Sequence, residues 1–395
     1  MRRNVILASC LALALGTLGC QEQSNELSAP SDTSTRQVGK ESFNDLALKR
    51  GLVRMPIRGR LSDRHLSDFA SRVIDPTDYV CEPDSPVFDW FNAEFNESLA
   101  QDFPELFRLV VEFAADQVPF MEAVFLLDES TPQEFGYDGD FTGVMRKTER
   151  DVKRFWDIRS DDILLLAMKG TMLQDEARVA AVYENFFTDG DGTLITPAEA
   201  AGYAATVRQL LNQAETLDGG DDPLFSFGAF AFSTPGQHDR IVMGDGLLEG
   251  FKAVGLGDVA PQALYSHEFA HHIQYENGYF DEVPPGATPP VAAAEFSRYI
   301  ELMADAMTGY YLTHKRGATM NKHRVVEFLN VFFQFGDCGF TSSNHHGTPA
   351  QRMRAAEFGF SVADEAQKRG HILTSDQFHD LFVAAYPDLV APDAT

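Results

Sequence analysis

The sequence predicts an α+β fold that is predominantly helical and contains one small sheet. Three stretches have the apolar spacing of amphipathic helices, namely residues 99–128, 174–187 and 197–217. Only residues 225–234 and 239–243 have the composition and length of strands. Long helical segments beside so few strand signals indicate the α+β class.

Turn-forming residues from Gly219 to Pro223 mark the best candidate for a domain boundary. A chain of 395 residues is long enough for two domains of ordinary size. We therefore predict a mostly helical N-terminal domain at residues 41–224 and a second domain at residues 225–390.

The first 19 residues have the features of a secretory signal peptide. Arg2 and Arg3 precede an apolar run at residues 5–18, and a small residue stands before Cys20. The apolar run is too short to span a bilayer. Residues 1–19 are therefore predicted to direct export.

Thr17-Leu18-Gly19-Cys20 resembles a bacterial lipobox, apart from Thr17 where leucine is usual. The resemblance implies lipidation of Cys20 and, with Gln21 beside it, sorting to the outer membrane. The alternative is an ordinary cleaved signal and a soluble periplasmic or secreted protein. The polar residues 20–40 are predicted to form a flexible tether in either case.

Export makes the remaining cysteines interpretable. With Cys10 in the signal peptide and Cys20 lipidated, Cys81 and Cys338 remain. An even pair in an oxidising compartment favours a disulfide between Cys81 and Cys338. Two free buried thiols are the alternative.

The formal net charge of −27 restricts the partners. Nucleic acid and anionic membrane surfaces repel such a chain, so contact with a membrane is expected only through the lipid anchor. A cationic or neutral polypeptide is a more compatible substrate.

Residues 267–271 read HEFAH and have the HExxH pattern by which many hydrolases present a zinc ion. Residues four apart share one face of an α-helix, so His267 and His271 can direct two imidazole nitrogens at one ion. Glu268 lies beside that face and can accept a proton from a metal-bound water. A half-buried helix with two histidines and no chemistry is the alternative.

The flanking residues support this helix. Asp258 can cap its first turn, Pro261 fits within that turn, and Gly278 can end the helix.

A catalytic zinc site needs a third protein ligand and an open position. Residues 289–312, with Thr288 as cap, are predicted to form a second helix that supplies a glutamate. Glu301 is the predicted ligand. Asp305, one turn further on, is the predicted partner for the N–H of a liganding histidine. Glu295 is the competing ligand.

Three segments together resemble the bacterial neutral zinc metallopeptidase family, which is of the gluzincin type. The segments are HEFAHHIQ at 267–274, RYIELMADAMTGYY at 298–311 and HHGTPAQRMRAAEFG at 345–359. They correspond in order and spacing to the family motifs HExxHxxQ, ELxAD and HGTxxQR. The resemblance covers roughly residues 238–360. Family members often have a cysteine after ELxAD, where this chain has Ala306.

The resemblance implies a zincin-like peptidase domain at residues 225–390, with Zn²⁺ held by His267, His271 and Glu301. It also implies that Glu268 is the catalytic base and that Asp305 orients a histidine. Gluzincin-like folds keep a small sheet whose edge strand binds extended substrate, and residues 240–243 are the expected strand.

A developing oxyanion needs a further hydrogen-bond donor. His346 is the first candidate, and Tyr310 and Arg352 are the others. The alternative is purely structural, because residues 348–351 read TPAQ and form a capping box that can simply start a helix.

A second metal signal is the acidic stretch at residues 189–199, which is similar to an EF-hand calcium loop. Asp189, Asp191 and Glu199 are the possible Ca²⁺ ligands, although Glu199 comes one residue too late for a regular loop. A polar turn that caps a helix starting near Pro197 is the alternative.

These observations favour an exported, lipid-anchored zinc peptidase that hydrolyses polypeptides. Two alternatives stay open: a catalytically silent zincin-fold lipoprotein that acts as a binding module or scaffold, and a calcium-dependent envelope protein. The presence of Glu268 favours the enzyme, because a scaffold has no need of a base.

Overall fold

The computed structural model describes most of the chain after residue 84. The described residues are 85–188, 193–233, 238–288, 291–334, 336, 345–369 and 371–391. The predictions for the signal peptide, Cys20, the tether, Cys81, Cys338, Asp189 and Asp191 lie outside them. No helix in the described part combines the length and the apolarity that crossing a membrane requires.

The sheet has three strands, β1 (Ile163–Met168), β2 (Ala229–Phe232) and β3 (Asp239–Gly244), in the order β1-β3-β2. β1 pairs with β3 in parallel and β2 pairs with β3 antiparallel. β3 is the central strand, so the prediction of an edge strand at residues 240–243 is wrong.

The sequence did not reveal β1 because its letters, ILLLAM, form an unbroken apolar run. Such a run is typical of a strand covered on both faces, and periodicity alone does not distinguish it from a helix. Five of its six residues are buried. In a sheet of β2 and β3 alone, β3 would be an edge strand. Because β1 pairs with its other side, β3 is the central strand.

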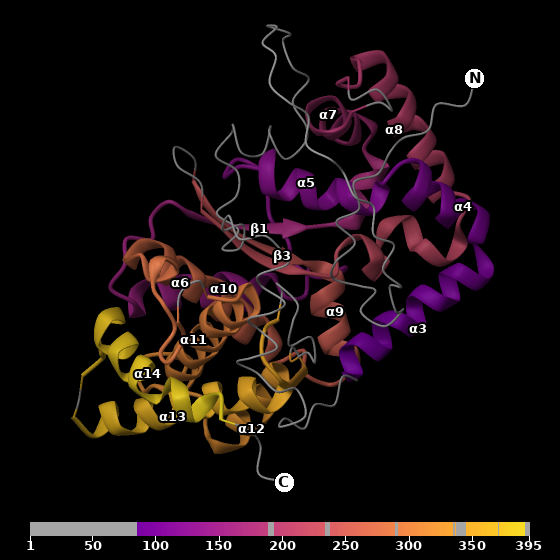
Figure 1. The fold of residues 1–395 in the computed structure, drawn as a ribbon. Coiled ribbons are helices and arrows are strands. Elements are labelled where there is room, and N and C mark those ends of the chain that lie inside the picture. Colours follow the sequence, from indigo (N-terminus) through magenta and orange to yellow (C-terminus); the bar gives the residue numbers. More distant parts are fainter. Residues whose placement is uncertain are drawn as a thin grey trace, which may run out of the picture.

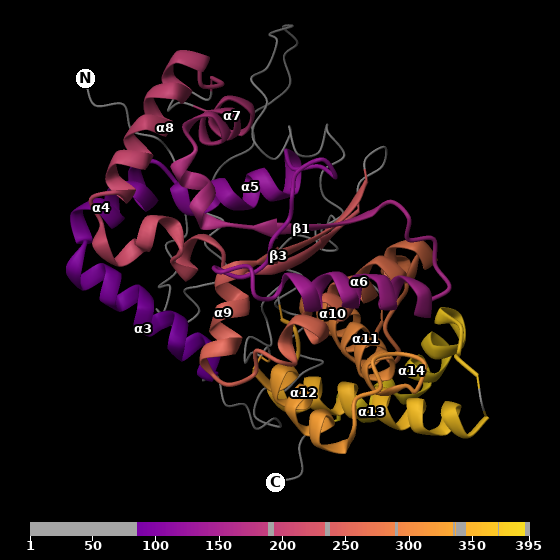
Figure 2. The same ribbon diagram turned by 180° about the vertical axis from the view of Figure 1, so that it is seen from behind.

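Helices cover both faces of this sheet (Figures 1 and 2). Leu165, Ile241 and Met243 belong to the main hydrophobic core, which contains α6 (Thr142–Phe155) and α10 (Ala260–Asn277). Leu166 and Val242 point the other way, because side chains alternate along a strand. They pack with residues of α5 (Val118–Phe125).

The predicted helix at 99–128 is wrong as a single element. The chain instead forms α3 (Pro86–Gln101), α4 (Phe103–Phe107), a π-helical turn (Arg108–Glu112) and α5. Asp102 leaves the helical conformation, and Ala114 has φ +48°, so the chain turns at both places. The predictions at 174–187 and 197–217 correspond to α7 (Glu176–Phe186) and the shorter α8 (Pro197–Leu211).

The C-terminal half is helical after β3. Its helices are α9 (Asp245–Ala253), α10 (Ala260–Asn277), α11 (Ala293–Thr313), α12 (Lys322–Gln334), α13 (Pro349–Arg369) and α14 (Ser375–Leu389). α10 ends at Gly278 with φ +74°, as predicted. Its N-cap is Val259 rather than Asp258, with no side-chain cap, and the N-cap of α11 is Ala292 rather than Thr288.

The main core takes side chains from both sides of the predicted boundary at residue 224. Phe155 and Ile163 lie in the same cluster as Ile241 and Phe269. The sheet and the main core therefore join the segments before and after residue 224. The division into two domains stays a prediction.

α11 and α13 approach each other closely at two glycines. A Cβ at Gly309 would lie 2.3 Å from the carbonyl oxygen of Ala356, and a Cβ at Gly359 would lie 2.0 Å from that of Ala306. Real Cβ atoms do not approach so closely, so only glycine permits this packing. The contact places Asp305 of α11 beside Arg352 of α13.

Candidate metal centre

The two histidines of the HExxH segment lie in a largely buried helix. Every residue of α10 from Ala260 to Gln274 is buried except Gln262. The helix is therefore buried rather than half-buried, and whether its histidines perform chemistry stays a prediction. The Nε2 atoms of His267 and His271 lie 3.2 Å apart, and their rings are perpendicular.

Glu301 of α11 completes a group with these histidines. Its Oε2 lies 3.2 Å from His267 Nε2, and its Oε1 lies 3.5 Å from His271 Nε2. The candidate ligand atoms of the three residues lie within 4.8 Å of one another, so the group could hold a metal ion. Among the described residues it is the only such group, and Glu295 is not part of it.

Each histidine has a partner for its second ring nitrogen. His267 Nδ1 lies 3.0 Å from Asp305 Oδ1, as the sequence predicted. His271 Nδ1 lies 2.8 Å from Gln274 Oε1, and Gln274 Nε2 donates to the carbonyl of Ile300 at 2.8 Å. Such partners set the tautomer and ring direction of a liganding histidine. We did not predict this role for Gln274, although its i+3 spacing from His271 was a signal.

Arg352 of α13 donates two hydrogen bonds to Asp305. Its Nε donates to Oδ2 and its Nη2 to Oδ1, both at 2.7 Å, and Nη2 lies 3.6 Å from Glu301 Oε2. Arg352 was a candidate oxyanion donor, but the structure directs these two nitrogens at Asp305.

Tyr310, the other alternative donor, belongs to the core. Its hydroxyl accepts from the N–H of Leu373 at 2.8 Å, and its ring lies against Trp156 and Phe378.

Burial and charge perturb the titration of this site. Burial raises the pKa of Glu268 to about 7. Burial also lowers the pKa of His271 to about 4, which leaves that ring neutral and ready to bind. Burial acts the same way on His267, but Asp305 and Glu301 outweigh it and raise the pKa to about 10. A cation that binds here must displace the proton of His267.

His346 lies on the loop before α13 and is half-buried. Burial raises the pKa of Glu268. The pKa of Glu301 lies well below its usual range, because His271, His346 and His267 outweigh burial there. His346 lowers the pKa of both acids by its coulombic influence. The structural alternative is also present, because Thr348 and Gln351 form the predicted capping box. Gly347, which lies between His346 and Thr348, has φ +100°, a conformation that favours glycine.

Glu199, a possible calcium ligand, takes part in a helix cap. Its Oε2 accepts hydrogen bonds from the N–H and the hydroxyl of Thr196, and α8 starts with this capping box. An isolated antiparallel bridge pairs Thr188 with Leu194. These contacts favour the polar-turn interpretation of Glu199, and the calcium site stays a prediction.

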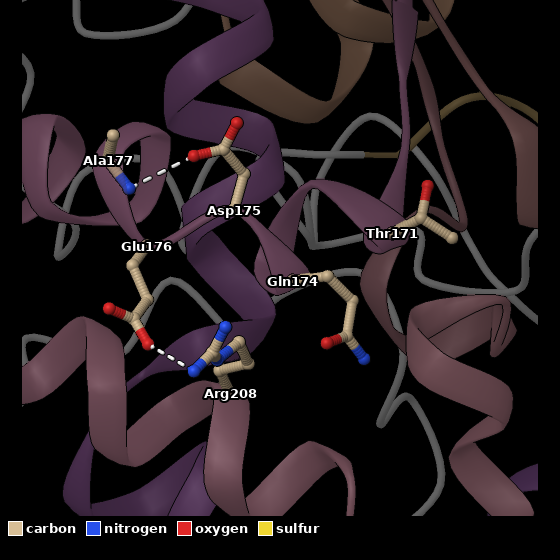
Figure 3. A pocket seen from close by; sticks show the side chains of 6 residues that line it. All are labelled: Thr171, Gln174, Asp175, Glu176, Ala177 and Arg208. Atoms are coloured by element: carbon tan, nitrogen blue, oxygen red, sulfur yellow. Dashed lines mark hydrogen bonds and ion pairs between the residues drawn. The ribbon is translucent and has the colours of Figure 1, made fainter.

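A surface hollow of about 480 Å³ lies elsewhere, between α7 and α8 (Figure 3). Its lining includes Asp175, Glu176 and Arg208. Asp175 caps α7, and Glu176 pairs with Arg208 at 2.8 Å. Its charged groups are thus engaged with one another or with a helix end, and none of the predicted site residues lines it.

No protein-family model, no curated protein and no solved structure matches this chain. The functional argument therefore depends on the motifs and on the geometry of the site.

Proposed function

We propose that this chain is an exported zinc-dependent peptidase of the gluzincin type. The observation that carries the proposal is the charge balance of a buried site. Glu268, Glu301 and Asp305 place three carboxylates near two imidazoles, and the guanidinium of Arg352 pairs with Asp305 and lies 3.6 Å from Glu301. Two negative charges are left when all three acids are ionised, and a divalent cation balances them.

The donor atoms fit zinc. Two imidazole nitrogens and one carboxylate are a frequent ligand set of catalytic zinc and leave a fourth position open. Other first-row divalent ions accept the same ligands. A zinc ion at this site would polarise a substrate carbonyl and supply a water of lowered pKa.

The protein groups would perform the proton transfers. The carboxylate of Glu268 takes a proton from the attacking water and returns it to the leaving amine. His346 is the proposed donor to the oxyanion. Its coupling to Glu268 and Glu301 supports a position at the reacting centre.

The sheet supports a polypeptide substrate. β2 is an edge strand that pairs with β3 alone among the described strands, and it contacts α10. An extended peptide can add to such an edge through main-chain hydrogen bonds. We therefore transfer the proposed substrate strand from β3 to β2. Anchoring through Cys20 would place the activity in the cell envelope.

The test compares the purified full-length chain with Glu268→Gln. We expect about one equivalent of zinc in both, and hydrolysis of a labelled unfolded protein by the parent alone. Loss of a general base lowers turnover by roughly 10²- to 10⁴-fold. Glu276→Gln, an exposed change on the same helix, is the matched control and should keep full activity.

Stoichiometric zinc without hydrolysis in the parent would favour the silent zincin-fold scaffold. A parent that binds no zinc would contradict the site itself.

A further inference from the structure

Arg352 is the buried charge at this site whose role the proposed chemistry does not include. Its side chain is 3% exposed, and that of Asp305 is 0% exposed. A carboxylate buried to this degree is costly unless it is paired and hydrogen-bonded. The planar guanidinium of Arg352 pairs with this carboxylate by directing two N–H groups at its two oxygens, which is the strongest arrangement for such a pair.

The pair connects the third sequence motif with the first two. Asp305 Oδ1 accepts from Arg352 Nη2 and also lies 3.0 Å from His267 Nδ1. The same Nη2 lies 3.6 Å from the ligand oxygen of Glu301. One guanidinium on α13 thus contacts the carboxylate that orients His267 and also lies near the candidate ligand Glu301, and both of these acids are on α11.

We propose that Arg352 is a positioning residue of the metal centre. By holding both oxygens of Asp305, it fixes the carboxylate that orients His267, and it restrains Glu301 from the same side. α13 therefore contributes to metal affinity without providing a ligand. The proposal rests on the metal-binding part of the proposed function and does not depend on peptidase activity.

This role differs from donation to an oxyanion. Turning Nε or Nη2 toward a substrate would take a hydrogen bond from the buried carboxylate of Asp305, which would keep the imidazole of His267 but lose half or all of its pairing with the guanidinium. A positioning residue is therefore expected to affect zinc affinity, whereas an oxyanion donor would affect turnover at unchanged zinc affinity.

The experiment measures zinc affinity by competition with a chelator, and the absorption spectrum with Co²⁺, in the full-length chain. Arg352→Gln should weaken zinc binding roughly 10- to 100-fold, the range typical for groups that orient metal ligands. Arg352→Lys keeps the charge and loses the paired N–H groups, so we expect a smaller loss and an altered Co²⁺ spectrum.

A double-mutant cycle isolates the path of the effect. In an Asp305→Asn background, Arg352→Gln should change zinc affinity by less than about threefold, because the two hydrogen bonds through which it mainly acts are already lost and only the longer contact to Glu301 remains. Arg354→Gln is the matched control on the same helix, since Arg354 donates to the carbonyls of Leu389 and Ala391. It should leave zinc affinity unchanged.

Unchanged zinc affinity and spectrum in folded Arg352→Lys and Arg352→Gln would overturn the proposal. Fully additive losses in the cycle would also overturn it. A parent that binds zinc but hydrolyses nothing would contradict the peptidase assignment alone, because the affinities still decide the role of Arg352.

Discussion

The two faces of the sheet bury ionised groups in different ways. On the α5 face, Glu122 is buried and Arg178 meets both of its oxygens, at 2.5 and 2.6 Å. One acid and one base close this pair. On the α10 face, Glu268, Glu301 and Asp305 gather around His267, His271 and a single guanidinium. The acids there outnumber the fixed cation.

The difference distinguishes a structural ion pair from a candidate metal-binding site. A balanced buried pair needs nothing further, and its hydrogen bonds are satisfied within the chain. An unbalanced cluster is stable only with protons or a cation. Burial raises the pKa of Glu268, and Asp305 and Glu301 outweigh burial and raise the pKa of His267. The excess of acids over fixed cations therefore distinguishes the candidate metal centre from the Glu122–Arg178 pair, whereas the surface hollow is lined by none of the candidate ligands.

The largest expected effect is on metal binding. Glu301→Gln should weaken zinc affinity on the order of a thousandfold, because one of three protein ligands is lost. Glu295→Gln changes the competing carboxylate on the same helix and should retain about one equivalent of zinc. Metal analysis after gel filtration measures both, and equal retention of zinc would remove Glu301 from the site.

The next largest effect is expected from a change in the spacing between α11 and α13. Gly359→Val should destabilise the fold by roughly 1–3 kcal/mol through overpacking against the Ala306 carbonyl, and it should weaken zinc binding by separating Asp305 from Arg352. Gly202→Ala in α8 meets no atom within 4 Å and should stabilise by about 0.5–1 kcal/mol. Denaturant unfolding measures both changes, and equal effects would show that the close approach is unimportant.

Removing the unbalanced charge should stabilise the metal-free chain. Burial raises the pKa of Glu268 from 4.5 to about 7, so the folded state holds this proton more tightly than the unfolded state does. Its stabilising contribution is complete below pH 4.5 and is lost as the pH rises through about 7. Glu268→Gln mimics the protonated form, and at pH 8 it should raise the free energy of unfolding by roughly 2–3 kcal/mol.

The same comparison at pH 4 is the control for Glu268→Gln. The gain should disappear there, because the parent carboxyl is then protonated in the folded state. A gain that does not depend on pH would contradict the charge argument.

The smallest effect is expected on the balanced face. Arg178→Gln should destabilise by about 1–2 kcal/mol, less than for a fully buried pair because the Arg178 side chain is 40% exposed. Zinc affinity should not change. A loss of zinc affinity in this variant would show that the two faces are energetically coupled.

The residues that the sequence predicted best are those whose spacing along one helix sets their direction. The pairs His267–His271 and Glu301–Asp305 are each four residues apart, and the structure places each pair on one face as predicted. The prediction failed for β1 and for the edge strand, because pairing between distant strands leaves no local periodicity. It also did not anticipate the pairing of Arg352 with Asp305, because the two residues are on different helices.

The sequence by itself determined the helical frame of the site: which histidines and carboxylates share a helix face, and where α10 ends at Gly278. Helical periodicity is a local property, so the order of residues is sufficient for it. Only the tertiary structure decided that β2 is an edge strand, that Gly309 and Gly359 bring α11 against α13, and that the guanidinium of Arg352 meets the carboxylates of Asp305 and Glu301. Those features depend on packing between segments far apart in the chain, where burial sets the energy of every charge.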